Sequence, residues 1–243
     1  MRRNSCTVIV LASPVPAEVL GTVGRSMNVT LVRPAEPVGS DGATGQAAGQ
    51  AAGQAAGRAA GRADGRADGL AAAAGALRRA ASATSPYALV TADPLAAVAE
   101  GWRGMWDLAR PQGPARFEQE ASAALTAWRA GQFELPDYYL VVAGAAEGAT
   151  ASAPADPGAA EPSGQPDQLD PDFYLGPLRA ARPHRVAFVP AAEAAEQAAG
   201  VLQALGSLRH GPWWPSLDEL IDTARNFYPG HLAETATASR DDT

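Results

Sequence analysis

The sequence contains no lysine, because all 19 basic residues among its 243 are arginine. This absence excludes chemistries that need a lysine amine, such as a Walker A phosphate loop, Schiff-base catalysis and pyridoxal phosphate catalysis. It also excludes a receiver domain that depends on a lysine after its last strand. With abundant alanine, glycine and proline, the exclusive use of arginine indicates a GC-rich coding sequence, as in a high-GC bacterium.

Cysteine is nearly absent as well, since Cys6 is the single one. One thiol cannot form an internal disulfide or a cysteine metal site, and its place in an apolar run indicates a small buried side chain. The histidines, His184, His210 and His231, are too far apart to show metal-ligand spacing. No run approaches the ~20 apolar residues that span a bilayer. We therefore expect no metal site, no membrane segment and a cytoplasmic location.

Two internal segments lack the large apolar residues that a folded core needs. Residues 45–69 repeat Gly-Gln-Ala-Ala, then Gly-Arg-Ala-Ala and Gly-Arg-Ala-Asp, with glycine at every fourth position. Because glycine costs a helix ~1 kcal/mol per residue, we predict a flexible linker over residues 34–69. Residues 145–168, rich in alanine, proline, glycine and acids, are predicted to be disordered, as is the tail 232–243. The arginines of the repeat have no aromatic neighbours and the net charge is −7, so nucleic acid is not an expected partner.

Five short, continuously apolar segments are typical of strands that are covered on both faces. They are Thr7–Leu11, Val29–Val32, Tyr87–Val90, Tyr138–Val142 and Arg185–Val189. Each is followed by at least one segment with helical periodicity. This alternation predicts a single α/β domain over residues 1–231, with a doubly wound, mostly parallel sheet. Right-handed crossovers favour the flavodoxin-like strand order 2-1-3-4-5, with a half-Rossmann order as the alternative.

Local signals mark the starts of several helices. Asp93 and Pro94 precede a helix with an apolar stripe, and the Asp93 side chain is expected to accept hydrogen bonds from the first free amides. Ser216 and Glu219 have the spacing of a capping box. Residues 171–182 are predicted to form a helix that ends before Pro183.

In a doubly wound sheet, ligands bind beyond the carboxyl ends of the strands, where the strand order reverses. In the favoured order, this crevice lies between the loops after the first and third strands. The candidate crevice residues at the strand ends are Ser13, Arg33, Thr91, Asp93 and Gly144.

The first of these loops does not suit a phosphate. Pro14 and Pro16 lack the amide groups that a glycine-rich loop would offer to a phosphate, so we expect no NAD, FAD or FMN site and no other cofactor. Asp93 lacks the paired acidic residues that would hold magnesium in a receiver domain, so helix capping is its preferred role. No G-x-S-x-G motif is present, and no catalytic residue is assigned.

Two aromatic pairs stand out near the C-terminus: Trp213 with Trp214, and Phe227 with Tyr228. One interpretation makes them the lid of the core. The other makes them an interface for a protein partner or for a second copy of the chain, because aromatic residues are enriched at interface cores.

The sequence thus supports two functional hypotheses. The favoured one is a non-catalytic interaction or regulatory module, because no catalytic constellation is present. The alternative is an enzyme or a binder of a small ligand, such as a nucleotide or another phosphate-containing molecule, that uses the predicted crevice.

Overall fold

The computed structural model describes residues 6–34, 54–107, 111–143 and 173–228, and for residues 54–67 it describes the backbone helix alone. The strands are β1 (Thr7–Leu11), β2 (Val29–Val32), β3 (Tyr87–Val90), β4 (Tyr138–Val142) and β5 (Val186–Val189). The helices are α1 (Ala17–Val23), α2 (Gln54–Ala81), α3 (Ala96–Met105), α4 (Gly113–Arg129), η1 (Tyr174–Leu178), α5 (Arg179–Ala181), η2 (Pro183–Arg185), α6 (Ala194–Gly206) and α7 (Leu217–Asn226).

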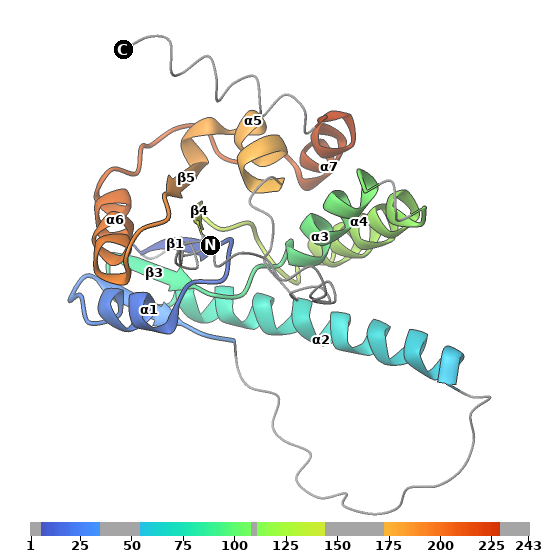
Figure 1. The fold of residues 1–243 in the computed structure, drawn as a ribbon, viewed down its shortest axis with the longest axis horizontal. Helices are drawn as coiled ribbons and strands as arrows, with labels where there is room; N and C mark the ends of the chain where they lie inside the picture. Colours follow the sequence, from blue (N-terminus) through green and yellow to red (C-terminus); the bar gives the residue numbers. More distant parts are fainter. Residues whose placement is uncertain (1–5, 35–53, 108–110, 144–172, 229–243) are drawn as a thin grey trace, which may run out of the picture.

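The five strands form one sheet in which every neighbouring pair is parallel, which confirms the predicted α/β class (Figure 1). All five predicted strands are present, and β5 begins one residue later than expected. Helices cover both faces of the sheet. Alternate residues of β1 show this directly, because Val8 and Val10 belong to one core cluster whereas Ile9 and Leu11 belong to the other.

The strand order is 2-3-1-4-5, so both predicted orders are wrong in detail. Strand β3 lies between β2 and β1, whereas the flavodoxin-like order places β1 beside β2. The connection from β1 to β2 therefore passes over one strand position, which β3 fills later. Right-handed crossovers permit this arrangement as readily as the predicted one. Strands β1 and β3 are neighbours in the predicted and in the observed order. The loops that follow them therefore lie side by side, as the predicted crevice requires.

Side-chain hydrogen bonds at the amino ends of the strands join the strands in the observed order. The Ser85 hydroxyl lies 2.8 Å from the Thr30 hydroxyl and links the segment before β3 to β2. The Val8 amide donates to the Asp137 carboxylate at 2.8 Å and links β1 to the start of β4. These bonds are polar and specific, whereas the apolar strand residues themselves discriminate little between neighbours.

The two faces of the sheet carry unequal layers. Helices α1 and α6 contact each other and cover the smaller core, which contains Val19, Val23, Val201 and Leu205. The other face carries α2, the tightly associated pair α3 and α4, the η1 segment and α7. The β1–β2 connection runs along the sheet in the direction opposite to the later connections, so right-handed crossovers place α1 on the face opposite to α2, α3 and α4, whereas α6 follows the last strand and packs beside α1.

Helix α2 corrects one sequence prediction. It begins at Gln54, so residues 54–69 of the predicted flexible linker 34–69 are helical. Alanine, the best helix former, occupies six of the sixteen positions from 54 to 69. The C-terminal part of α2 contacts the sheet and contributes Ala74 and Leu77 to the larger core, and a helix extends from an established end more easily than it nucleates.

The segment from Tyr174 to Leu178 also differs from expectation. It is a π-helix with Pro177 in its interior, rather than the regular α-helix predicted over residues 171–182. Proline has no amide hydrogen and clashes with the preceding turn, so an irregular turn accommodates it better. A Cβ on Gly176 would lie 2.9 Å from the Phe227 ring, so this segment and the end of α7 are closely packed.

Helix α7 begins as predicted, because the Ser216 hydroxyl accepts from the Glu219 amide at 3.2 Å. Before it, the Trp214 side chain is 5% exposed and its indole N–H donates to the Pro136 carbonyl at 2.7 Å. The Trp102 indole donates to the Ala224 carbonyl at 2.8 Å. Both indoles are buried and satisfied, and they attach α7 to the rest of the core.

Several predictions concern residues outside the described part of the chain, including the disordered segment 145–168 and the tail 232–243. Cys6 is buried, as predicted. Across the described ranges, no helix is both long enough and apolar enough to cross a lipid bilayer.

Candidate functional site

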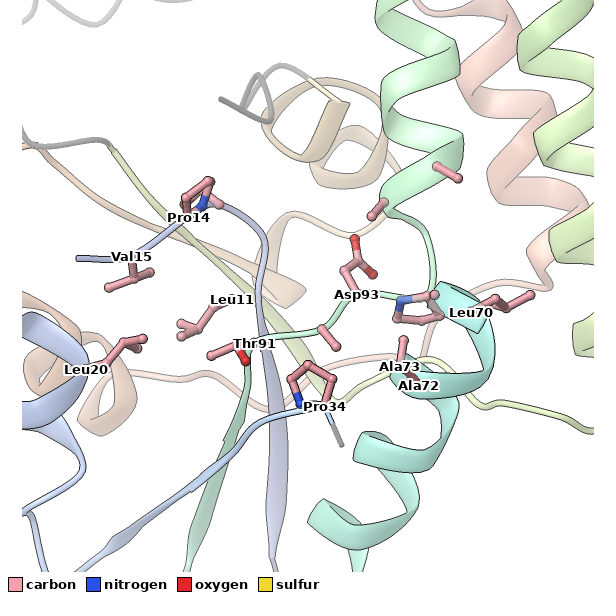
Figure 2. A pocket seen from close by; sticks show the side chains of 16 residues that line it. Leu11, Pro14, Val15, Leu20, Pro34, Leu70, Ala72, Ala73, Thr91 and Asp93 are labelled. Atoms are coloured by element: carbon pink, nitrogen blue, oxygen red, sulfur yellow. The ribbon is translucent and has the colours of Figure 1, made fainter. Parts of the chain in front are cut away.

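A pocket of about 650 Å³ lies at the carboxyl ends of β1 and β3 (Figure 2). Of the five predicted crevice residues, Ser13, Thr91 and Asp93 line it. Arg33 is exposed and is not part of the lining, and its carbonyl accepts from the Arg79 side chain at 2.7 Å. Gly144 lies outside the described residues. The structure therefore brings three of the five side chains to one cavity.

The pocket has an aliphatic surface. Its walls come from the loop after β1, from the first turns of α1 and α3, from the end of β2 and from α2. The apolar lining residues labelled in Figure 2 are Leu11, Pro14, Val15, Leu20, Pro34, Leu70, Ala72 and Ala73. The lining described for this pocket includes neither arginine nor histidine.

The Ser13 side chain is committed to the sheet. Its hydroxyl donates to the Val142 carbonyl and accepts from the Val142 amide at 3.0 Å. Both backbone groups of the last residue of β4 are thus satisfied by one side chain from the loop after β1. This role anchors the loop, and within the described residues the hydroxyl is bonded to backbone groups and not to the base that a nucleophile needs.

Asp93 is the centre of a hydrogen-bond network that joins three elements. Its carboxylate accepts from the Leu95 amide at 2.9 Å, from the Tyr139 hydroxyl at 3.2 Å and from the Tyr174 hydroxyl. The Leu95 bond closes the turn just before α3, whose N-cap is Leu95 without a side-chain cap, so Asp93 supports the approach to the helix and does not cap it as predicted. The tyrosine bonds connect the end of β3 to β4 and to the π-helix η1.

Burial raises the pKa of the Asp93 carboxyl to about 6, although the hydrogen bonds from Tyr174, Leu95 and Tyr139 lower it. Burial and the nearby Asp93 charge also raise the pKa of Tyr139 and of Tyr174 well above the usual tyrosine value, so both hydroxyls remain protonated donors. Strongly shifted groups gather at functional sites, and they also occur in structural networks.

The raised pKa of Asp93 predicts a specific pH dependence of stability. A carboxyl that binds its proton more tightly when folded stabilises the protein at low pH and loses that contribution as the pH rises through its folded pKa. The shift from 3.8 to about 6 corresponds to about 3 kcal/mol. Relative to Asp93→Asn, we expect the wild type to lose about 2–3 kcal/mol of unfolding free energy between pH 4 and pH 7.5.

Urea denaturation of both proteins at several pH values measures this difference, and the variant serves as the control for every other titrating group. Asparagine can still accept from the Leu95 amide, so the turn before α3 is retained. A difference that is constant with pH, or that grows as the pH falls, would contradict the assigned pKa shift.

The four aromatic residues predicted as an interface do not form one surface. Trp214 is buried in the core, and the Phe227 ring packs against the Trp102 ring with 6.4 Å between the ring centres. Trp213 and Tyr228 are 40% and 58% exposed and lie at opposite ends of α7. The core-lid interpretation is therefore confirmed for Trp214, whereas binding of a partner at Trp213 or Tyr228 stays a prediction.

Sequence reasoning missed the partners of Asp93 and the role of Arg185. Tyr139 and Tyr174 are 46 and 81 residues from Asp93, and nothing local signals their convergence. The apolar pattern places Arg185 at the start of the fifth strand, but its buried guanidinium contacts the loop before Trp213. The only available signal was its position between a proline-containing turn and an apolar strand.

The comparisons with known proteins do not supply a family. No family model matches the chain, and neither a curated protein nor a solved structure matches it.

Proposed function

We propose that this chain is a non-catalytic interaction or regulatory module. The observation that carries the proposal lies at the carboxyl edge of the sheet, where α/β enzymes place their reactive groups. There the Ser13 hydroxyl is bound to both backbone groups of Val142, and the Asp93 carboxylate already accepts three hydrogen bonds. Both side chains serve the fold.

One experiment tests the non-catalytic part. The full chain is incubated with a metabolite extract, and mass spectrometry follows every species over time. We expect no time-dependent change relative to Asp93→Asn or to protein-free extract. Paired loss of one metabolite and gain of another, abolished in Asp93→Asn, would make the chain an enzyme.

A second experiment tests the interaction part through a photo-crosslinking residue, benzoylphenylalanine, placed at Trp213 or at Tyr228 in cells. Both positions present exposed aromatic side chains beside α7. Met27 is the matched control, because its side chain is 96% exposed and lies after α1. We expect discrete protein adducts at position 213 or 228 that exceed those at position 27. Equal yields at all three positions would contradict an interface here.

A specific observation also favours a second candidate function, a small-ligand binder. The pocket of about 650 Å³ falls within the range of about 300–1,000 Å³ that is usual for ligand sites. It also lies between the loops of β1 and β3, whose connections leave toward opposite faces of the sheet. Such a switch point is where open α/β sheets bind ligands.

A further inference from the structure

We propose that the pocket between the β1 and β3 loops binds an uncharged, largely apolar molecule that carries one hydrogen-bonding group, which contacts the Thr91 hydroxyl. This inference rests on the second proposed function, that the pocket takes a small ligand. It replaces the nucleotides and phosphate compounds expected from the fold class with an uncharged, largely apolar ligand.

The walls favour an apolar body. One side of the pocket is formed by Val15 and Leu20 of the α1 region, and the opposite side by Leu70 and Ala73 of α2 (Figure 2). Leu11 contributes to the base between them. A ligand that covers these aliphatic side chains removes their surface from water, which is the main driving force for binding in such sites.

The charges of the lining disfavour an anion. No arginine or histidine belongs to the described lining, so a phosphate or carboxylate would enter without a counter-ion. Asp93 is the single ionisable residue of the lining, and its negative form would repel an anion. The prolines at positions 14 and 16 also remove the amide hydrogens that could replace a basic side chain.

Asp93 gives little support for binding of a cation either. The Asp93 carboxylate accepts from two tyrosine hydroxyls and from the Leu95 amide. In Figure 2 it points away from Thr91 and Pro34. An ammonium group in the aliphatic part of the pocket would therefore lose its hydration without gaining a well-placed carboxylate.

Thr91 supplies the polar contact. Its side chain is partly buried and lies between Leu11 and Pro34 in Figure 2. Among the described residues its hydroxyl has no hydrogen-bond partner, in contrast to the hydroxyl of Ser13. A hydroxyl both donates and accepts, so it suits an alcohol or a carbonyl group on an otherwise apolar ligand.

Three probes with one ring system test the charge preference: 2-naphthylmethanol, 2-naphthoate and 2-naphthylmethylamine, titrated into the full chain at pH 7.5 by calorimetry. We expect the alcohol to bind at least fivefold more tightly than either ion. If the carboxylate or the amine binds most tightly, the uncharged class is wrong although the pocket remains a ligand site. If none of the three binds, the small-ligand function itself fails.

Two substitutions locate the binding. Thr91→Val preserves shape and removes the hydroxyl, so it should weaken the alcohol about 3–10-fold and leave the affinity for 2-methylnaphthalene unchanged. Ala72→Phe fills the pocket and should abolish binding, whereas Ala71→Phe is the control because Ala71 is exposed on the same helix outside the lining. Equal effects of both phenylalanine variants, or an unchanged alcohol affinity in Thr91→Val, would overturn the proposed site.

Discussion

Replacing Gly113 by alanine is expected to lower the free energy of unfolding by about 3 kcal/mol or more. Gly113 begins α4 at the point where α4 contacts α3. A Cβ at this position would lie 1.8 Å from the Gly104 carbonyl oxygen and 2.4 Å from the carbonyl carbon. These are backbone atoms, so a rotamer change cannot relieve the overlap, and the two helices would have to separate.

Separation of α3 and α4 would disturb much of the larger core. Gly101 makes a second close contact on the same helix pair, because a Cβ there would lie 2.9 Å from the Phe117 Cα atom. Trp102 directly follows Gly101 in α3, is 1% exposed and packs against Phe173. The loss at Gly113 therefore includes disturbed aromatic packing in addition to the local overlap.

Gly206→Ala is the control for this prediction, because a Cβ on Gly206 has no atom within 4 Å. Alanine is the better helix former, so no loss of stability is expected there. Chemical denaturation of the two variants measures the difference. A Gly113→Ala protein as stable as the wild type would show that the helices do not approach each other as described.

Replacing Arg185 by methionine is expected to cost about 3–5 kcal/mol. The Arg185 side chain is buried, and its guanidinium donates to three backbone carbonyls. The acceptors are Pro212 at 3.1 Å, Asp137 at 3.0 Å and Gly211 at 2.9 Å. Methionine has a similar length but no donor, so these carbonyls would lose their partner in a partly buried environment.

Two rings hold the guanidinium in place. Its central carbon lies 5.0 Å from the centre of the Tyr138 ring and 4.7 Å from that of Trp213, distances that allow cation–π attraction. The planar guanidinium suits both rings and the three carbonyls, whereas an ammonium group does not. Arg185→Lys is therefore expected to recover only part of the lost stability.

Arg129→Met provides the matched control. The Arg129 side chain is 61% exposed and pairs with Asp218 on the surface, and such pairs contribute at most about 1 kcal/mol. Thermal and urea unfolding of the three arginine variants should rank them as Arg185→Met, Arg185→Lys and Arg129→Met, from the least to the most stable. Equal losses for Arg185→Met and Arg129→Met would show that the buried contacts contribute little.

The local elements of this fold are predictable from the sequence because their signals are local. The β-branched run Thr7–Leu11 and the capping box at Ser216 each specify an element without reference to distant residues. The strand order is not predictable in this way, because burial and crossover handedness are satisfied equally by both arrangements. The polar contacts that hold the observed order, such as Ser85 with Thr30, join residues 55 apart.

The candidate site is likewise predictable in its local features and not in its long-range contacts. The loop positions of Ser13, Thr91 and Asp93 follow from the ends of predicted strands, and the structure brings all three to one pocket. Their chemical environments do not follow, because the partner of Ser13 is Val142, 129 residues away. The linker prediction over the first half of α2 is wrong for a different reason. The low helix propensity of glycine underestimates the stability of a helix that extends from a packed end.

The placement of β3 between the first two strands has a consequence for synthesis on the ribosome. Residue Thr7 pairs with Tyr87, and Val29 pairs with the same residue from the other side. Until β3 has emerged, neither early strand has a neighbour for its backbone groups, and β3 then pairs with both, while the other edge of β1 waits for β4. The nascent chain thus carries two unpaired apolar strands until Tyr87–Val90 is synthesised, the period in which chaperones would bind it most readily.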